Sequence, residues 1–174
     1  TLLYDTDTLT RSSIIEEPYI FTYCLGSEIN GGNKNAINEI RKKYGNIKVV
    51  AASIPGTPSN VEEYADRVIY DATPDIWMSL IKHAAFVFTD SFHGTLFSIK
   101  YKKQFFTYYT SKIRSSRILD IKERYNLNNA IISSIDDLKA KISINPHIDY
   151  QETNFLVQEH INHSINFLKK SLNI

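Results

Sequence analysis

Residues 85–98 read AFVFTDSFHGTLFS, and the rest of the sequence can be arranged around this stretch. Its first four residues form a dense apolar run, which is typical of a strand buried on both faces. Small and polar residues follow at 89–94, and from Leu96 onward apolar residues recur at helical spacing. The stretch therefore predicts a strand, a tight polar turn and a helix. Such turns lie at the carboxyl ends of parallel strands, where α/β proteins bind ligands and helix amides favour anions.

The side chains of this turn suit anion binding or proton transfer. Ser91 and Thr95 carry hydroxyl donors, and Gly94 allows a ligand to approach the backbone closely. Histidine side chains titrate near neutral pH, so His93 can donate a hydrogen bond to a phosphate or move a proton. The same residues also fit an ordinary helix start, with Ser91 as the N-cap and His93 in the first turn. The residues alone leave both interpretations open.

The order of the predicted elements defines the fold class. Strands are predicted at residues 18–25, 47–52, 67–70, 85–89, 104–108 and 128–132. Helices follow at about 36–44, 73–84, 95–100, 115–125, 134–142 and 149–173. Strands that alternate with helices indicate a Rossmann-like parallel α/β sheet flanked by helices. The last helix is expected to carry one apolar face made of Val157, Ile161, Leu168 and Leu172.

Two further segments are predicted at the same edge of the sheet as His93. Gly26 and Ser27 follow the first predicted strand, in a loop that matches neither a dinucleotide-binding fingerprint nor a P-loop. Arg114 and Arg117 follow the fifth predicted strand, among several hydroxyl residues. Guanidinium groups bind phosphates and carboxylates through paired hydrogen bonds. These residues also fit a plain connecting loop and a solvated helix start.

The composition is that of an ordinary globular protein. The 174 residues are 43% hydrophobic, and the formal net charge of +1 argues against a nucleic-acid partner, which would need a strongly basic surface. Cys24 is the only cysteine, so an internal disulfide and a cysteine metal cluster are excluded. His160 and His163 lack further ligands for a metal site, so we expect a surface pair and no metal. We also expect no membrane span, because no apolar run approaches the required length.

The segment TDSFHGTLFSI at residues 89–99, with TPDIWMSLIKHAAFVF before it and KKQFF after it, resembles the polysaccharide pyruvyl transferase family. That family carries a Phe-His-Gly motif after a strand, and many members have an arginine directly before it, where this chain has Ser91. The opening TLLYD resembles the family's linker region, and RSSRILDIKERYNL at 114–127 resembles a segment of its bacterial members. The resemblance reaches from residue 1 to about 127, and the SFHG neighbourhood is its specific part.

The resemblance implies a GT-B-like enzyme of two domains, of which this chain supplies the C-terminal half. Residues 1–17 would be a linker region, and residues 18–174 a Rossmann-like domain that is inactive without its N-terminal partner domain. The implied reaction moves a pyruvyl group from phosphoenolpyruvate to a sugar hydroxyl of a polysaccharide or its lipid-linked saccharide precursor. Exopolysaccharide biosynthesis in the bacterial cytoplasm, or at the inner membrane surface, would be the setting. Phosphoenolpyruvate would be a co-substrate, and no cofactor is implied.

The resemblance also implies roles for the residues at the strand ends. His93 would act as the general acid or as an anion ligand, and Arg117 would neutralise substrate charge. The substrate-binding residues would be Ser91, Gly94, Thr95, Arg117, Arg114, Gly26 and Ser27.

Two other functions stay open at this stage. The first is a GT-B-type glycosyltransferase that uses a nucleotide sugar, although no acidic residue is obviously placed to hold a donor ribose. The second is a sugar- or partner-binding module that keeps the fold without catalysis, which the absence of an arginine before Phe92 favours.

Overall fold

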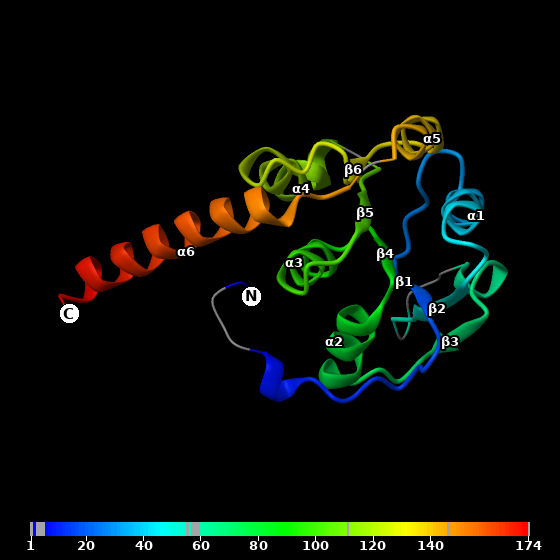
Figure 1. The fold of residues 1–174 in the computed structure, drawn as a ribbon, viewed down its shortest axis with the longest axis horizontal. Helices are drawn as coiled ribbons and strands as arrows, with labels where there is room; N and C mark the ends of the chain where they lie inside the picture. Colours follow the sequence, from blue (N-terminus) through cyan, green and yellow to red (C-terminus); the bar gives the residue numbers. More distant parts are fainter. Residues whose placement is uncertain are drawn as a thin grey trace.

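The strands form a single parallel sheet in a computed structural model that describes residues 2, 6–54, 56, 60–110, 112–145 and 147–173. The sheet has six strands in the order β3-β2-β1-β4-β5-β6 (Figure 1). The strands are β1 (Tyr19–Tyr23), β2 (Lys48–Ala52), β3 (Arg67–Ile69), β4 (Phe86–Thr89), β5 (Phe105–Tyr108) and β6 (Ile131–Ile132). Every neighbouring pair is parallel, which confirms the predicted Rossmann-like α/β class.

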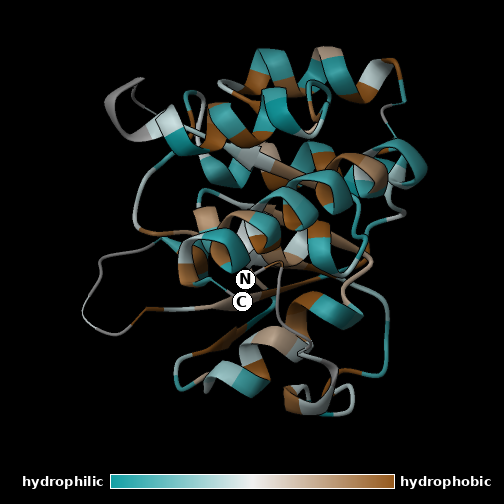
Figure 2. Ribbon diagram, turned by 90° about the vertical axis from the view of Figure 1, so that its left-hand side faces the viewer, coloured by the Kyte–Doolittle hydropathy of each residue, from teal (hydrophilic) through white to brown (hydrophobic). Residues whose placement is uncertain are grey.

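Helices cover both faces of this sheet. They are α1 (Asn33–Lys43), α2 (Pro74–His83), α3 (Phe92–Lys100), α4 (Lys112–Arg124), α5 (Ile135–Ser143) and α6 (Tyr150–Leu172), with short 3-10 turns at Asp7–Leu9 and Val61–Glu63. The cores on the two faces show that α1 and α5 share one face, while α2, α3 and α4 share the other (Figure 1). The helices carry both hydrophilic and hydrophobic residues, as helices that cover a sheet do (Figure 2).

The strand β4 lies inside the sheet, between β1 and β5. All four of its residues are buried, as the dense apolar run predicts. Phe86 and Phe88 belong to the core beneath α1 and α5, whereas Val87 belongs to the core beneath α2 and α3. The ring of Phe88 stacks on that of Tyr108 with the centroids 5.0 Å apart. Apolar side chains on both faces therefore explain why this strand does not alternate with polar residues.

The buried face of α3 combines small residues with one apolar residue of the predicted pattern. Its buried residues are Gly94, Thr95, Ser98 and Ile99, whereas Leu96 and Phe97 are only partly buried. Small side chains let this helix lie close to β4 and β5. Spacing finds the helix and the buried Ile99, but the tight contact with the sheet also selects for residue size.

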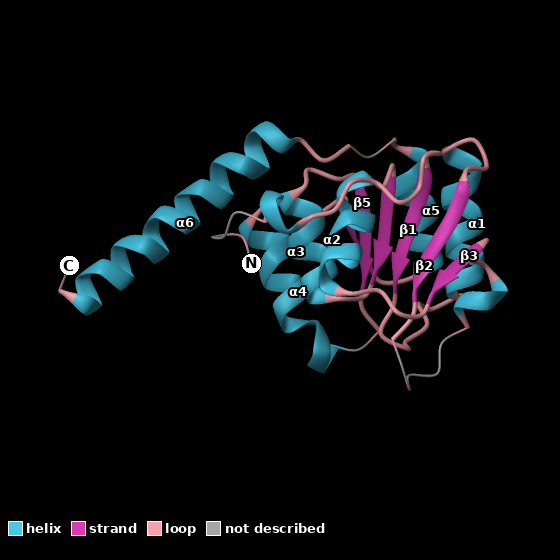
Figure 3. Cartoon of the chain, turned by 90° about the horizontal axis from the view of Figure 1, so that it is seen from below, coloured by secondary structure: helices cyan, strands magenta, loops and turns pink. Residues whose placement is uncertain are grey.

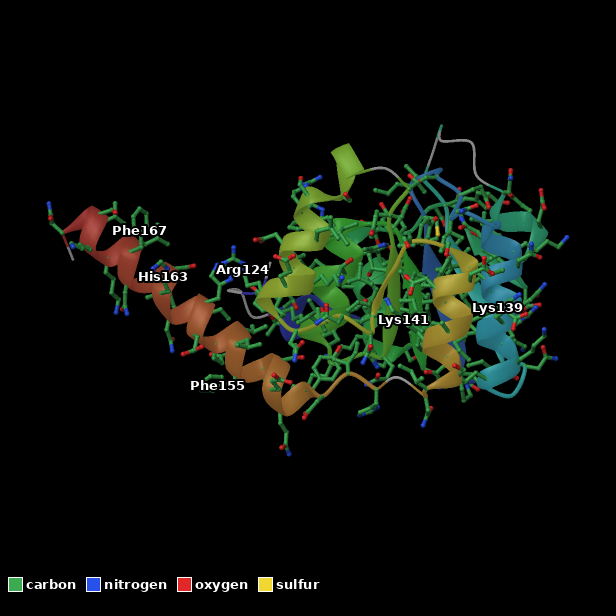
Figure 4. All side chains as sticks on the ribbon, turned by 90° about the horizontal axis from the view of Figure 1, so that it is seen from above. Arg124, Lys139, Lys141, Phe155, His163 and Phe167 are labelled. Carbon is green, nitrogen blue, oxygen red and sulfur yellow. The ribbon has the colours of Figure 1, made fainter. Side chains whose placement is uncertain are left out.

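The last helix, α6, packs against the body through its first half only. Its N-cap is Asp149, whose side chain accepts a hydrogen bond from the Gln151 amide at 2.8 Å. Val157 is buried, but Leu168 and Leu172 are 50% and 64% exposed, so the predicted apolar face is covered only near the helix start. Figure 3 shows the rest of α6 extending beyond the sheet, and Figure 4 shows Phe167 on this part.

Smaller differences concern the ends of elements. Thr73 is the N-cap residue of α2, at the start of the predicted helix, but its hydroxyl donates to the Asp75 carboxylate instead of accepting from an amide. The helix α4 begins at Lys112, three residues before the predicted start. Trp77 is half-buried, with its ring between those of Tyr23 and Phe97.

The described part of the predicted linker region lies against α2 and α3. The Thr6 hydroxyl lies 2.9 Å from that of Tyr101, and the Ser79 hydroxyl donates to the Arg11 carbonyl at 3.1 Å. The division into a linker at 1–17 and a domain at 18–174 stays a prediction. In the described part of the chain, no helix has the length and apolar character needed to cross a membrane.

Candidate active site

The candidate site lies at the carboxyl edge of the sheet, where the strand order reverses between β1 and β4. The chain proceeds from β1 outward to β2 and β3, and from β4 outward to β5 and β6. Ligands of open α/β sheets bind in the crevice that such a reversal leaves. A cavity of about 490 Å³ lies there, lined by Leu25, Ser27, Asp90, Ser91, Phe92, His93, Tyr108, Tyr109, Thr110, Ser116, Arg117 and Ile118. It joins the segments that follow β1, β4 and β5.

The turn after β4 begins α3 with Ser91 as its N-cap. The Ser91 Oγ accepts a hydrogen bond from the Gly94 amide at 3.2 Å, as the helix-start interpretation predicts. The Thr95 hydroxyl donates to the Ser91 carbonyl at 2.9 Å and lies 2.9 Å from the Thr107 hydroxyl. Ser91 and Thr95 are 3% and 0% exposed, so their hydroxyls hold the turn together. Their contacts with a substrate stay a prediction.

Two backbone amides at the start of α3 have no acceptor within the helix. The first amides of a helix have no acceptor within it, and in α3 these belong to Phe92 and His93. Both residues line the cavity. Free amides together with the helix dipole favour a negatively charged group at this position.

Gly94 allows the turn to approach β4 closely. A Cβ atom at this position would lie 2.7 Å from Oγ1 and 3.2 Å from Cγ2 of Thr89. The Thr89 hydroxyl is fixed, because it donates to the Tyr23 carbonyl and accepts from the Ser91 amide at 3.0 Å. The close approach that Gly94 permits in the structure is therefore to the strand. A ligand contact at Gly94 stays a prediction.

Replacing Gly94 by alanine is expected to destabilise the protein by about 1–3 kcal/mol, because the added methyl group meets a fixed hydroxyl in a packed site. Helix propensity alone would make Gly94→Ala stabilising, so a decrease in the free energy of unfolding would show that the clash outweighs propensity. Thermal or denaturant unfolding measures it. The loss should be smaller when Gly94→Ala is combined with Thr89→Ala. An equal loss in both backgrounds would contradict the packing explanation.

His93 and Arg117 are the predicted charged or titratable residues that line this cavity. Both side chains are exposed. The guanidinium carbon of Arg117 lies 4.8 Å from the centre of the Phe92 ring, and that ring meets the His93 ring edge-on at 5.6 Å. Among the described residues, no carboxylate forms an ion pair with Arg117. A positive charge therefore lies beside the Ser91 turn and is available to bind an anion.

The other predicted site residues differ in position. Ser27 lines the cavity, while its neighbour Gly26 does not and adopts φ of 86°, a left-handed conformation that glycine favours. The side chain of Arg114 lies outside the described residues. The predictions for Gly26 and Arg114 therefore rest on the sequence alone.

Asp90 is a site residue that sequence reasoning missed. Its carboxylate accepts hydrogen bonds from the Leu25 amide at 2.7 Å and from the Ser27 hydroxyl, so it joins the loop after β1 to the turn after β4. Burial raises the pKa of Asp90 above its ordinary value, although both hydrogen bonds oppose this shift. Its place directly after a predicted buried strand was the signal that could have found it.

Tyr108 also holds the loop that follows β1. Its hydroxyl donates to the Ser27 carbonyl at 2.7 Å and accepts from the Asn33 side-chain amide at 2.9 Å. Burial raises the pKa of Tyr108, so the phenol stays protonated and acts as a hydrogen-bonding support. It ends the strand β5, and the sequence predicts this position only as the end of a strand.

Two other reactive side chains, those of Cys24 and His160, do not line this cavity. Burial raises the pKa of the Cys24 thiol to about 12, so it does not supply a thiolate nucleophile. The Nδ1 atom of His160 lies 2.6 Å from the Tyr125 hydroxyl, which replaces the predicted surface pair with His163. Within the described residues, no group of three His, Cys, Asp or Glu side chains could hold a metal ion.

Fold and cavity together define a GT-B-like α/β protein with a crevice at the strand reversal that is lined by Arg117, His93 and Asp90. Its fold is similar to that of UDP-GlcNAc 2-epimerase from Methanocaldococcus jannaschii, with a TM-score of 0.54 and 16% identity over 88% of this chain and 47% of that chain. A complex of the M. jannaschii epimerase with UDP-GlcNAc and UDP gives a TM-score of 0.53 and 15% identity, over 88% and 46% of the two chains. Such low identity shows the fold alone. This chain spans about half the length of these epimerases.

The chain belongs to the polysaccharide pyruvyl transferase family. The family model matches residues 7–112, more than half of the 174 residues, and the match includes the turn with Ser91 and His93. No curated protein matches the sequence. Arg117 lies beyond the matched range, so its place in the site comes from the structure.

Proposed function

We propose that this protein takes part in transfer of a pyruvyl group from phosphoenolpyruvate to hydroxyl groups of a saccharide. The observation that carries the proposal is the position of Arg117 over Phe92, in the same cavity as His93 and beside Ser91. Many family members carry an arginine directly before the Phe-His-Gly motif. In this chain Ser91 stands at that position, and the Arg117 guanidinium from α4 supplies a cation next to it, over Phe92. Phosphoenolpyruvate, the proposed donor, carries both a phosphate and a carboxylate that a cation can bind.

The chemistry assigns a role to each part of the cavity. Arg117 and the free amides of Phe92 and His93 bind the anionic groups of the donor. A sugar hydroxyl adds across the enol double bond, so its oxygen bonds to C2 and a proton reaches C3. A second hydroxyl then displaces phosphate and closes the ketal. His93 is the general acid or base for these proton movements, because its exposed ring lines the cavity.

The complete enzyme requires more than this chain in our proposal. The chain spans about half the length of the epimerases that share its fold, and one α/β domain supplies one wall of an interdomain cleft. We propose that an N-terminal domain supplies the other wall and that the 174 residues alone do not transfer pyruvate. Phosphoenolpyruvate is an intracellular metabolite, so the proposed setting is the bacterial cytoplasm or the inner membrane surface, with a sugar or lipid-linked saccharide as acceptor.

A ligand titration tests the proposed donor. Phosphoenolpyruvate at one hundred times its Kd should stabilise the folded chain by about 2.7 kcal/mol, since it binds only the native state. For a domain of this size that corresponds to a rise in Tm of roughly 5–10 °C. The control is a titration with UDP-sugars, because UDP-GlcNAc is bound by an epimerase of the same fold. Stabilisation by UDP-sugars alone would favour a glycosyltransferase. If neither ligand stabilises the chain, a binding module without catalysis is favoured.

A further inference from the structure

A second cavity lies on the other side of His93. It has a volume of about 480 Å³ and shares Leu25, Ser91 and His93 with the cavity that contains Arg117. From this shared wall it extends over the ends of β1 and β2 toward α2. We call it the aromatic cavity, because Tyr23, Trp77 and Phe97 form part of its wall.

The two cavities differ in charge. Arg117 and Asp90 line the first one, whereas no Lys, Arg, Asp or Glu lines the aromatic cavity among the described residues. A phosphate or carboxylate would gain no ion pair there and would lose its water, which is unfavourable. The aromatic cavity therefore suits a neutral ligand with apolar surface, and His93 is the titratable residue that touches both compartments.

Trp77 contributes its aromatic ring to the aromatic cavity. The indole meets Tyr23 and Phe97 edge-to-face, with centroids 5.3 and 5.2 Å away. Its Nε1 atom is buried, so the ring surface is the part of Trp77 that a ligand can reach.

We propose that the aromatic cavity holds a pyranose ring of the acceptor saccharide, an inference that rests on the proposed function. A pyranose is neutral and has apolar C–H faces that pack on aromatic rings such as those of Tyr23, Trp77 and Phe97. The donor occupies the Arg117 cavity. In this arrangement the reacting hydroxyl meets the donor at His93, which is the wall that both cavities share.

Tryptophan fluorescence tests the proposal directly, because Trp77 is the only tryptophan in the chain. The 174-residue chain is titrated with methyl pyranosides of gluco, galacto and manno configuration and with oligosaccharides built from them. At least one is expected to shift the emission of Trp77 in a saturable way. Phosphoenolpyruvate is expected to leave that emission nearly unchanged, because it binds in the other cavity.

Two matched variants localise the binding. Ala72→Phe places a ring in the aromatic cavity, where it takes up space that the saccharide needs, and should weaken saccharide binding about tenfold, an effect of about 1.4 kcal/mol. Ala85→Phe adds the same ring at an exposed site before β4, at the opposite edge of the sheet, and should leave binding unchanged. Phosphoenolpyruvate binding should survive in both variants, which also shows that they fold.

Three results would overturn the inference. If ligand-detected NMR shows saccharide binding without an emission change, and Ala72→Phe binds normally, the acceptor lies elsewhere while the donor assignment stands. If no saccharide binds the chain, the aromatic cavity is not an acceptor site. If UDP shifts the Trp77 emission and saccharides do not, the aromatic cavity binds a nucleoside. In that case the proposed function stands only if phosphoenolpyruvate still binds the chain.

Discussion

Replacing His93 by alanine in the full-length enzyme is expected to lower turnover by about 10²–10⁴-fold, the usual contribution of a single acid–base group. His93 is exposed and makes no contact that holds the turn, since Ser91 and Thr95 supply those bonds. The variant should therefore unfold at nearly the same temperature as the parent. Steady-state kinetics with both substrates and a melting curve measure the two effects.

The split between kcat and KM separates the possible roles of His93. Loss of proton transfer lowers kcat, whereas loss of an anion ligand mainly raises the KM for the donor. His93→Gln keeps a hydrogen-bond donor but cannot move a proton near neutral pH, so it should restore binding without turnover. His163→Ala removes an exposed histidine on α6 and is the matched control. A fully active, stable His93→Ala enzyme would refute the mechanism.

The central part of the fold could be predicted because its signals are local. A run of four apolar residues, a polar turn and a helical repeat specify β4 and α3 without knowledge of their neighbours. The exposure of Leu168 and Leu172 could not be predicted, since the spacing of apolar residues on α6 does not show where the surface beneath the helix ends. The burial of small residues on α3 likewise could not be predicted, because it depends on the distance between this helix and the sheet.

The candidate site follows the same division. His93 and Ser27 could be placed at one edge because strand ends of a parallel sheet meet there. The hydroxyls of Ser91 and Thr95 are suitable donors in the sequence, but their bonds within the turn become visible only in the structure. Asp90 was missed because its bonds to Leu25 and Ser27 connect residues more than sixty positions apart.

Under the proposed function, Arg117 compensates for the serine that stands before the Phe-His-Gly motif. Ser91 is the N-cap of α3, and its hydroxyl is occupied by the Gly94 amide. An arginine at the same place would supply charge but no cap. In this chain the two tasks are divided, because Ser91 caps the helix and Arg117 brings its charge from α4 across the ring of Phe92.

Removing the Arg117 guanidinium is therefore expected to weaken phosphoenolpyruvate binding by roughly 100-fold, the loss of a pair of charge-assisted hydrogen bonds. Arg117→Ala should abolish most of the thermal stabilisation by the donor while the free protein keeps its Tm, since Arg117 is exposed and forms no ion pair among the described residues. Arg117→Lys keeps the charge without the planar fork and should fall between the two.

Arg124 provides the control for this experiment on the same helix. Its guanidinium donates to the Asp120 carboxylate at 2.9 and 3.2 Å. It does not line the cavity that contains His93, although it lines a neighbouring cavity of about 450 Å³ together with Arg117. Surface pairs of this kind contribute little, so Arg124→Ala should leave donor binding intact and change stability by less than about 1 kcal/mol. Equal losses of affinity for phosphoenolpyruvate in both variants would mean that α4 acts through its overall charge. Normal phosphoenolpyruvate binding by Arg117→Ala would refute the role of Arg117 in donor binding, on which the proposed function rests.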